Sequence, residues 1–355
     1  MFASPQFFIC ISTHLSTMPI DTEDYNDMRK IILPFTINVE AKAYQYSAYA
    51  LGAIKASLTD SHLWAAGKFL SIYFESNNQL HMYDADFWSI NEGITTQSSI
   101  TINLAAMCLS RSELLEVVKH KIIDGNYIVG MFDEFYIPRK ISYGKRHYFH
   151  DYLLYGFDES QQILKAAGYL DNARYDVYDI PYDAYLDSIT LCDTDEVTLY
   201  FRYVDNQYVP TLPIADIRCK LEDILLSKPN LPHYKGELEK TFGIAGMKLF
   251  QRYITDFNQD KLDLRNSRTY TEYFQYMYSR LQVLALTGYL DEDNWISNYY
   301  RDLVKPSLLI HNMCVKYNVY RNEEVLTHAS DMIHTVNMRE IDYIKRLLEK
   351  LDSTL

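Results

Sequence analysis

The spacing of apolar residues changes near residue 212, and this change constrains the fold more than any other feature of the chain. Before it, a helical segment over residues 40–58 is followed by short apolar runs of strand length. After it, segments such as TYTEYFQYMYSRLQVLALTGYL carry helical periodicity with almost no strand signal. The sequence therefore predicts an α+β part with antiparallel strands, followed by a helical part. We expect an N-terminal extension over 1–29, an α+β domain over 30–212 and a helical domain over 213–355.

Local patterns predict the individual elements of the α+β part. The pattern of residues 29–35 predicts a short strand or an extended lead-in. Residues 62–74 are predicted to form a second helix, and LLEVVKHKIIDG a helix that ends at Gly125. The segment NYIVGMFDEFYIP predicts a strand that ends at Pro138. Two apolar runs in HYFHDYLLYGFDESQQILKAAGYLDN, separated by a turn, predict a β-hairpin. VTLYFRYV predicts one more strand.

Composition excludes several classes of function. The formal charge of −13 disfavours both nucleic acid and an anionic membrane surface as partners. No run reaches the roughly 18 to 20 apolar residues that a membrane-spanning helix needs, and the apolar opening MFASPQFFICIST lacks the basic region of a signal peptide. The five cysteines are scattered without zinc spacing. We therefore expect reduced thiols, no bound metal and a cytoplasmic protein.

The helix predicted for residues 40–58 opens with the stretch AYQYSA at residues 43–48. It is similar to the nucleophile helix of papain-like enzymes, which often runs Cys, aromatic, any residue, aromatic, Ser, Ala. Only the first position differs, because Ala43 stands where the thiol is expected. A thiolate at a helix start gains from the helix dipole and the free amides, and it needs an imidazole within hydrogen-bond reach.

His150 is the candidate for that imidazole. It heads a predicted strand, and Gly156 follows it by six residues, an interval that resembles the one between the catalytic His and a Gly-Tyr pair in papain-like enzymes. The residue that orients the ring should come from the next strand, where Asp171 or Asn172 follows, and we assign Asp171. An oxyanion hole needs an amide shortly before the nucleophile, and Asn38 is the candidate donor.

These motifs together resemble a known family. The order ILPF, an aromatic-rich helix, WSINEG, DGNYIVGMFDEFYIP, KRHYFHDYLLYGFD and a helical tail is similar to the butirosin biosynthesis protein H family. Those proteins are similar in fold to the peptidase domains of bacteriocin-exporting transporters, and are hence papain-like. The resemblance covers roughly residues 30–200, with HDYLLYGFD its sharpest part, and extends more loosely to RTYTEYFQYMYSRLQ.

The resemblance implies acyl or peptidyl transfer in specialised-metabolite biosynthesis, from a carrier-protein thioester to an amine-bearing small molecule or peptide. It implies that position 43 is the nucleophile position, that His150 is the base and that Asp171 orients it. The phosphopantetheine belongs to the acyl or peptidyl carrier protein, so the chain itself needs no cofactor.

Alanine cannot attack a thioester, so the resemblance leaves alternatives open. Either a cysteine at position 43 has been replaced, or the chain is a natural pseudoenzyme. With a cysteine, we expect ping-pong transfer to an amine or cyclising release of a chain. The alternatives are a non-catalytic binding or scaffold protein of an assembly line, and a cysteine peptidase-like hydrolase.

Charged and aromatic surfaces suggest how partners bind. A carrier protein, itself acidic, would need a local basic patch such as Arg139-Lys140 with Lys145-Arg146. The two acids of FDEFYIP are expected to face solvent, with binding of a cationic acceptor as the alternative. The rows of tyrosine in the tail helices serve either a homodimer contact or a substrate face.

Overall fold

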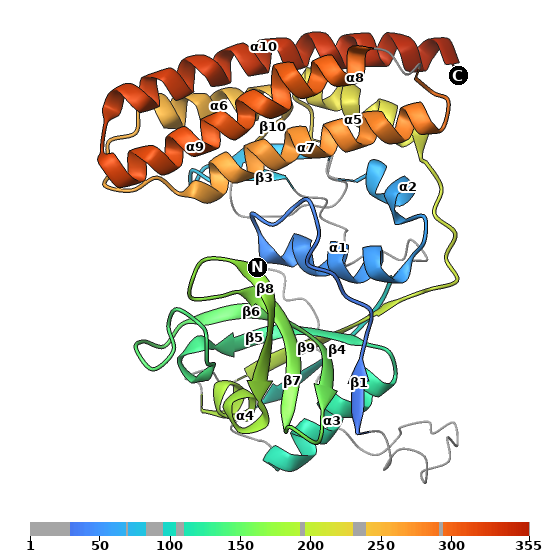
Figure 1. The fold of residues 1–355 in the computed structure, drawn as a ribbon, viewed down its shortest axis with the longest axis vertical. Coiled ribbons are helices and arrows are strands. Elements are labelled where there is room, and N and C mark those ends of the chain that lie inside the picture. The colour runs from blue at the N-terminus through green and yellow to red at the C-terminus, as the bar shows by residue number, and fades with distance from the viewer. Residues whose placement is uncertain are drawn as a thin grey trace, which may run out of the picture.

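The computed structural model describes residues 29–68, 70–82, 95–103, 110–191, 196–229, 239–290 and 294–354. The expected extension up to residue 28 and the WSINEG segment lie outside these ranges. Figure 1 shows a large sheet at the bottom, a helical region at the top and helix α1 (Gln45–Ser57) between them. The predicted combination of an antiparallel α+β part and a C-terminal helical region is confirmed.

The large sheet is antiparallel at every described pair of strands. Its order is β4 (Thr95–Asn103), β9 (Glu196–Val204), β5 (Tyr127–Asp133), β6 (Phe149–Asp158), β7 (Ile163–Tyr169) and β8 (Tyr175–Pro181). Strand β1 (Lys30–Ile32) pairs with the last residues of β6. The predicted hairpin is confirmed as β6 and β7, and the register of β5 on β6 sets Phe132 opposite His150.

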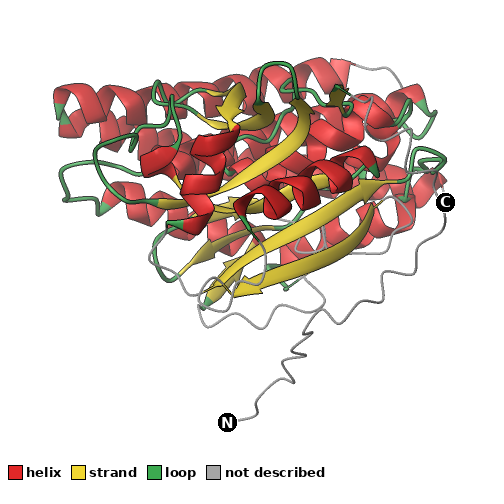
Figure 2. Ribbon diagram, turned by 90° about the horizontal axis from the view of Figure 1, so that it is seen from below, coloured by secondary structure: helices red, strands yellow, loops and turns green. Residues whose placement is uncertain are grey.

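Two hydrophobic cores lie on the two faces of this sheet. Along β6, Leu153 and Tyr155 join the core that contains α1, whereas Tyr152 and Leu154 join the core under helices α3 (Arg111–Ile123) and α4 (Tyr182–Thr190). This alternation follows from the period of two in a strand. Figure 2 views the sheet from the side of α3 and α4, with the helical region behind.

The helical region begins with α5 (Ile214–Leu226), directly after the extended segment that follows β9. It continues with α6 (Gly243–Thr255), α7 (Leu264–Leu286), α8 (Asn294–Tyr299), a π-helical turn (Tyr300–Val304), α9 (Lys305–Tyr320) and α10 (Glu323–Thr354). The hydrophobic core around α1 continues into these helices without a break at residue 212. Among the described helices, none combines the length and the apolar character that crossing a membrane requires.

A small second sheet joins the two parts of the chain and corrects one prediction. The helix expected over 62–74 ends early, as α2 (Ser61–Ala66), and the chain then forms β2 (Ile72–Glu75). Strand β2 pairs with β3 (Leu80–Met82) on one side and with β10 (Lys240–Phe242) on the other. The pairing with a strand far along the chain overrides the local helical pattern, which is why both β2 and β10 escape a local analysis.

Candidate functional site around His150

Helix α1 begins at Gln45, two residues later than the position predicted for the nucleophile. Its N-cap residue, Tyr44, makes no side-chain capping hydrogen bond. The preceding backbone is instead held by Glu272 of α7, whose Oε1 accepts the Lys42 N–H at 2.8 Å and whose Oε2 accepts the Ala43 N–H at 3.0 Å. The side chain of α1 that contacts His150 is therefore Gln45, while Ala43 is buried beside Glu272.

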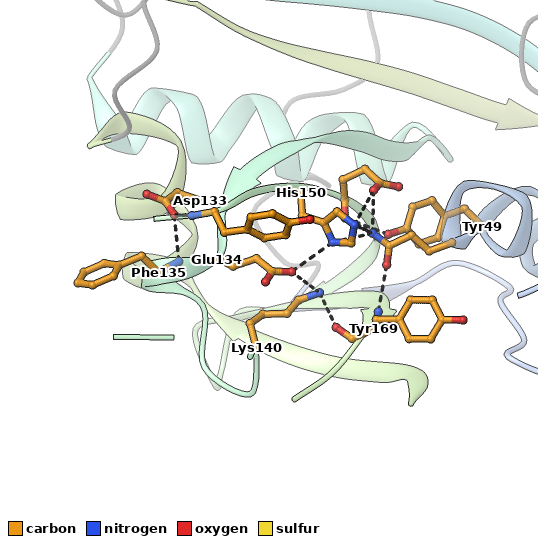
Figure 3. Close-up of polar contacts among 10 residues, drawn as sticks. Tyr49, Asp133, Glu134, Phe135, Lys140, His150 and Tyr169 are labelled. Atoms are coloured by element: carbon orange, nitrogen blue, oxygen red, sulfur yellow. Dashed lines mark hydrogen bonds and ion pairs between the residues drawn. The ribbon is translucent and has the colours of Figure 1, made fainter. Parts of the chain in front are cut away.

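The Gln45 carboxamide, which lies beside the labelled His150 in Figure 3, is fixed by three short hydrogen bonds. Its Oε1 accepts the Tyr169 N–H at 3.0 Å. Its Nε2 donates to the Asp151 carbonyl at 2.7 Å and to Asp151 Oδ1 at 2.8 Å. Tyr49, one turn along α1, donates to the same Asp151 carbonyl at 3.1 Å. Because an amide has two N–H hydrogens, both are used by Asp151 and none remains for the imidazole.

The Gln45 amide nitrogen nevertheless lies against the ring of His150, 3.1 Å from Nδ1 and 3.4 Å from Nε2. Glu134 Oε1 lies 3.3 Å from Nδ1, and Asp151 Oδ1 lies 3.5 Å from Nε2. The consistent assignment is an Nδ1–H that donates to Glu134. The carboxamide thus covers the ring where a nucleophile would have to lie.

Behind the ring is a buried ion pair that the sequence did not predict. Lys140 Nζ lies 3.6 Å from Glu134 Oε1 and donates to the Tyr169 carbonyl at 2.8 Å. It also lies over the rings of Phe132 and Tyr178. Burial lowers the pKa of Lys140, against the opposing effect of Glu134. Lys140 was expected to belong to an exposed basic patch with Arg139, Lys145 and Arg146. Because it is buried, it does not contribute to that patch.

The two acids of FDEFYIP are buried, which corrects the expectation that they face solvent. Glu134 belongs to the pair described above. Asp133 accepts from His147 Nδ1 at 2.6 Å and from the backbone N–H of Phe135 and Tyr148 at 3.0 Å each. Burial by itself would raise the pKa of Asp133, but these hydrogen bonds hold it below its ordinary value. Both acids thus organise the loop around the head of β6 rather than an acceptor site.

Two predicted site residues do not contact His150. Asp171 is exposed in the turn after β7, and its N–H donates to the Arg139 carbonyl. The carboxyl groups beside the ring belong instead to Glu134 and Asp151, because the β5–β6 pairing brings Glu134 there and β6 itself carries Asp151. Asn38 is an exposed loop residue whose N–H donates to Thr36 Oγ1. The orienting and oxyanion assignments therefore have no support in the contacts.

Gln45 and Glu134 are the residues that sequence reasoning missed. Gln45 was missed because the pattern aligned at Ala43 places it in the slot where any residue is allowed. Glu134 follows directly after β5, so it could have been placed near His150 only if the register of β5 on β6 had been known.

Within the described residues, nothing supplies a thiol or a metal to this site. The described free cysteines are Cys219, exposed on α5, and Cys314, buried on α9, and neither contacts His150. In the same ranges no three His, Cys, Asp or Glu side chains gather as metal ligands would. No protein-family model matches the chain, and no curated protein matches it.

Proposed function

We propose that this chain is a non-catalytic member of a papain-like acyltransferase scaffold, which binds an acyl or peptidyl carrier protein without turning its thioester over. The observation that carries the proposal is the Gln45 carboxamide, held by Tyr169 and Asp151 against both ring nitrogens of His150. An amide is no nucleophile, and this one covers the base that a thiol would need.

The surroundings of Ala43 also favour binding over transfer. The two N–H groups that could stabilise an oxyanion near a nucleophile at position 43 already donate to the Glu272 carboxyl group. That carboxyl is fully buried, which raises its pKa, and it also pairs with Arg268 Nε at 3.0 Å. A thiol at position 43 would therefore face an acid instead of free amides.

The loop that precedes β6 carries cations that favour an acidic partner. Within the described residues, Arg139, Lys145 and Arg146 make no ion pair, and all three are exposed. Exposed Ile141 and Tyr143 lie between them in sequence, on a loop held by backbone hydrogen bonds such as Gly144 N–H to the Phe135 carbonyl. Cations around apolar side chains, on a chain of net charge −13, favour an acidic protein surface through charge complementarity.

The docking test uses a carrier protein loaded with an acyl group through a stable amide, titrated into the chain by calorimetry. We expect saturable binding that weakens as salt is raised, because exposed charges are screened. Arg146→Glu should weaken binding at least about tenfold, a 1.4 kcal/mol effect on the scale of an exposed charge reversal. Lys316→Glu, an exposed charge reversal on α9, is the matched control and should bind as the parent does. Equal affinities for both variants would remove the docking surface from the proposal.

The second test places a thiol at each candidate position. Gln45→Cys should form an acyl adduct with an acyl-pantetheine thioester, detected by intact mass, because its thiol would stand at the helix start beside His150. Adding His150→Ala should slow the adduct at least about tenfold. Ala43→Cys should form little adduct. If Ala43→Cys instead formed more adduct than Gln45→Cys and gave an amide product with an added amine, the result would support an acyltransferase and contradict the binding function.

A further inference from the structure

A concave site apart from His150 lies where the helical region meets the small sheet. It is a groove of about 320 Å³ between the end of α6, the loop that follows it and the turn that joins β2 to β3. This volume is within the lower range of small-molecule sites. None of the residues that line it belongs to the network around His150, so it is a separate site.

Three aromatic side chains form the apolar wall of the groove. Phe74 of β2 lies 6.1 Å from Tyr253 of α6 between ring centroids, and Tyr253 meets Phe257 edge to face at 5.6 Å. Phe74 is buried, whereas Tyr253 and Phe257 are partly exposed. The two partly exposed rings leave aromatic surface on which a flat or apolar group can pack.

Two opposite charges stand one helical turn apart on the same groove. Arg252 lies in the last turn of α6, and Asp256 is its C-cap residue, with its N–H bound to the Arg252 carbonyl at 2.8 Å. Both side chains are exposed, and among the described residues neither makes an ion pair or a side-chain hydrogen bond. The guanidinium can therefore bind a carboxylate while Asp256 binds a cation.

Side-chain amides complete the lining. Asn78 comes from the β2–β3 turn, and Asn258 and Gln259 come from the loop after α6. Within the described residues these three carboxamides have no hydrogen-bond partner. A few convergent polar groups beside an aromatic wall are the usual composition of a small-molecule site.

We propose that this groove binds a free α-amino acid with an aromatic or large apolar side chain. The ligand's carboxylate binds Arg252, its ammonium group binds Asp256, and its side chain packs on Tyr253 and Phe257. A free amino acid carries both charges on adjacent atoms, whereas a peptide terminus carries only one, so the paired charges favour the free molecule. The groove has room for roughly ten to twelve non-hydrogen atoms at liquid density, which fits such a ligand.

The test titrates L-phenylalanine into the full chain and follows binding by calorimetry and by ligand-observed NMR. We expect saturable binding with a dissociation constant below about 1 mM, the affinity available to a ligand of this size. Phenylacetate and phenethylamine each lack one charge, and each should bind at least about tenfold more weakly. D-Glucose should not bind.

Arg252→Gln and Asp256→Asn should each weaken L-phenylalanine binding by about tenfold or more. Lys316→Gln, which changes an exposed charge elsewhere, should not change it. The absence of saturable binding, equal binding of phenylacetate, or a preference for D-glucose would each overturn the proposal. The comparison of L-phenylalanine with phenylacetate, phenethylamine and D-glucose uses the parent chain, so it tests the proposal even if a substitution disturbs folding. Carrier-protein binding is measured separately, so failure here leaves the His150 proposal untouched.

Discussion

A buried carboxyl group in the helical region makes the stability of this protein depend on pH in an unusual direction. Glu340 of α10 is fully buried, and its two oxygens accept from Tyr273 Oη and Tyr299 Oη at 2.9 Å each. Burial raises the pKa of Glu340 from 4.5 to about 7, although both hydrogen bonds and the charge of Arg280 oppose the rise.

The size of the effect on the free energy of unfolding follows from the difference in the pKa of Glu340 between the folded and the unfolded chain. Each unit of pKa difference corresponds to 1.36 kcal/mol, so 7 minus 4.5 gives about 3 kcal/mol as an order of magnitude. Below pH 4.5 Glu340 is protonated in both states and carries no penalty. Between pH 4.5 and 7 the unfolded chain releases this proton while the folded chain retains it, so the free energy of unfolding falls. Above pH 7 the penalty is complete.

Glu340→Gln should remove this penalty, because glutamine imitates the protonated acid in shape and hydrogen bonding. We expect the free energy of unfolding of the variant to exceed that of the parent by less than about 1 kcal/mol at pH 5 and by about 3 kcal/mol at pH 8. Urea unfolding, followed by far-UV circular dichroism at half-unit steps from pH 5 to 8.5, measures the difference. Glu349→Gln, an exposed change on the same helix, should give no such trend. A constant difference between Glu340→Gln and the parent at every pH would refute the reasoning.

Two other substitutions test the packing between layers. Gly156→Ala would place its Cβ 2.5 Å from the Ile31 carbonyl oxygen, so β1 must move; we expect a loss of about 1–3 kcal/mol in urea unfolding, and unchanged stability would contradict this close approach. Arg280→Met would leave the Ala66 and Lys68 carbonyls without the guanidinium that now donates to each at 2.6 Å; we expect a loss of about 2–4 kcal/mol, and a more stable variant would show that these bonds contribute little.

The sequence by itself determined the elements whose signals are local. The hairpin of β6 and β7 follows from two apolar runs and an intervening turn, and both strands were predicted. Helix α3 begins with a reciprocal pair of hydrogen bonds between Ser110 and Glu113, a signal contained within four residues. The division into an α+β part and a helical part follows in the same way from the change in apolar spacing near residue 212.

The tertiary structure alone decided which residues meet at His150. Helix α1 starts at Gln45 after a segment whose N–H groups are bound by Glu272, 229 residues beyond Ala43, and no local cap marks that start. Lys140 and Glu134 look like surface charges in the sequence but form a buried pair. The physical reason is that residues far along the chain, such as Tyr169 and Tyr178, enclose this pair and remove it from water, and a local pattern contains no record of them.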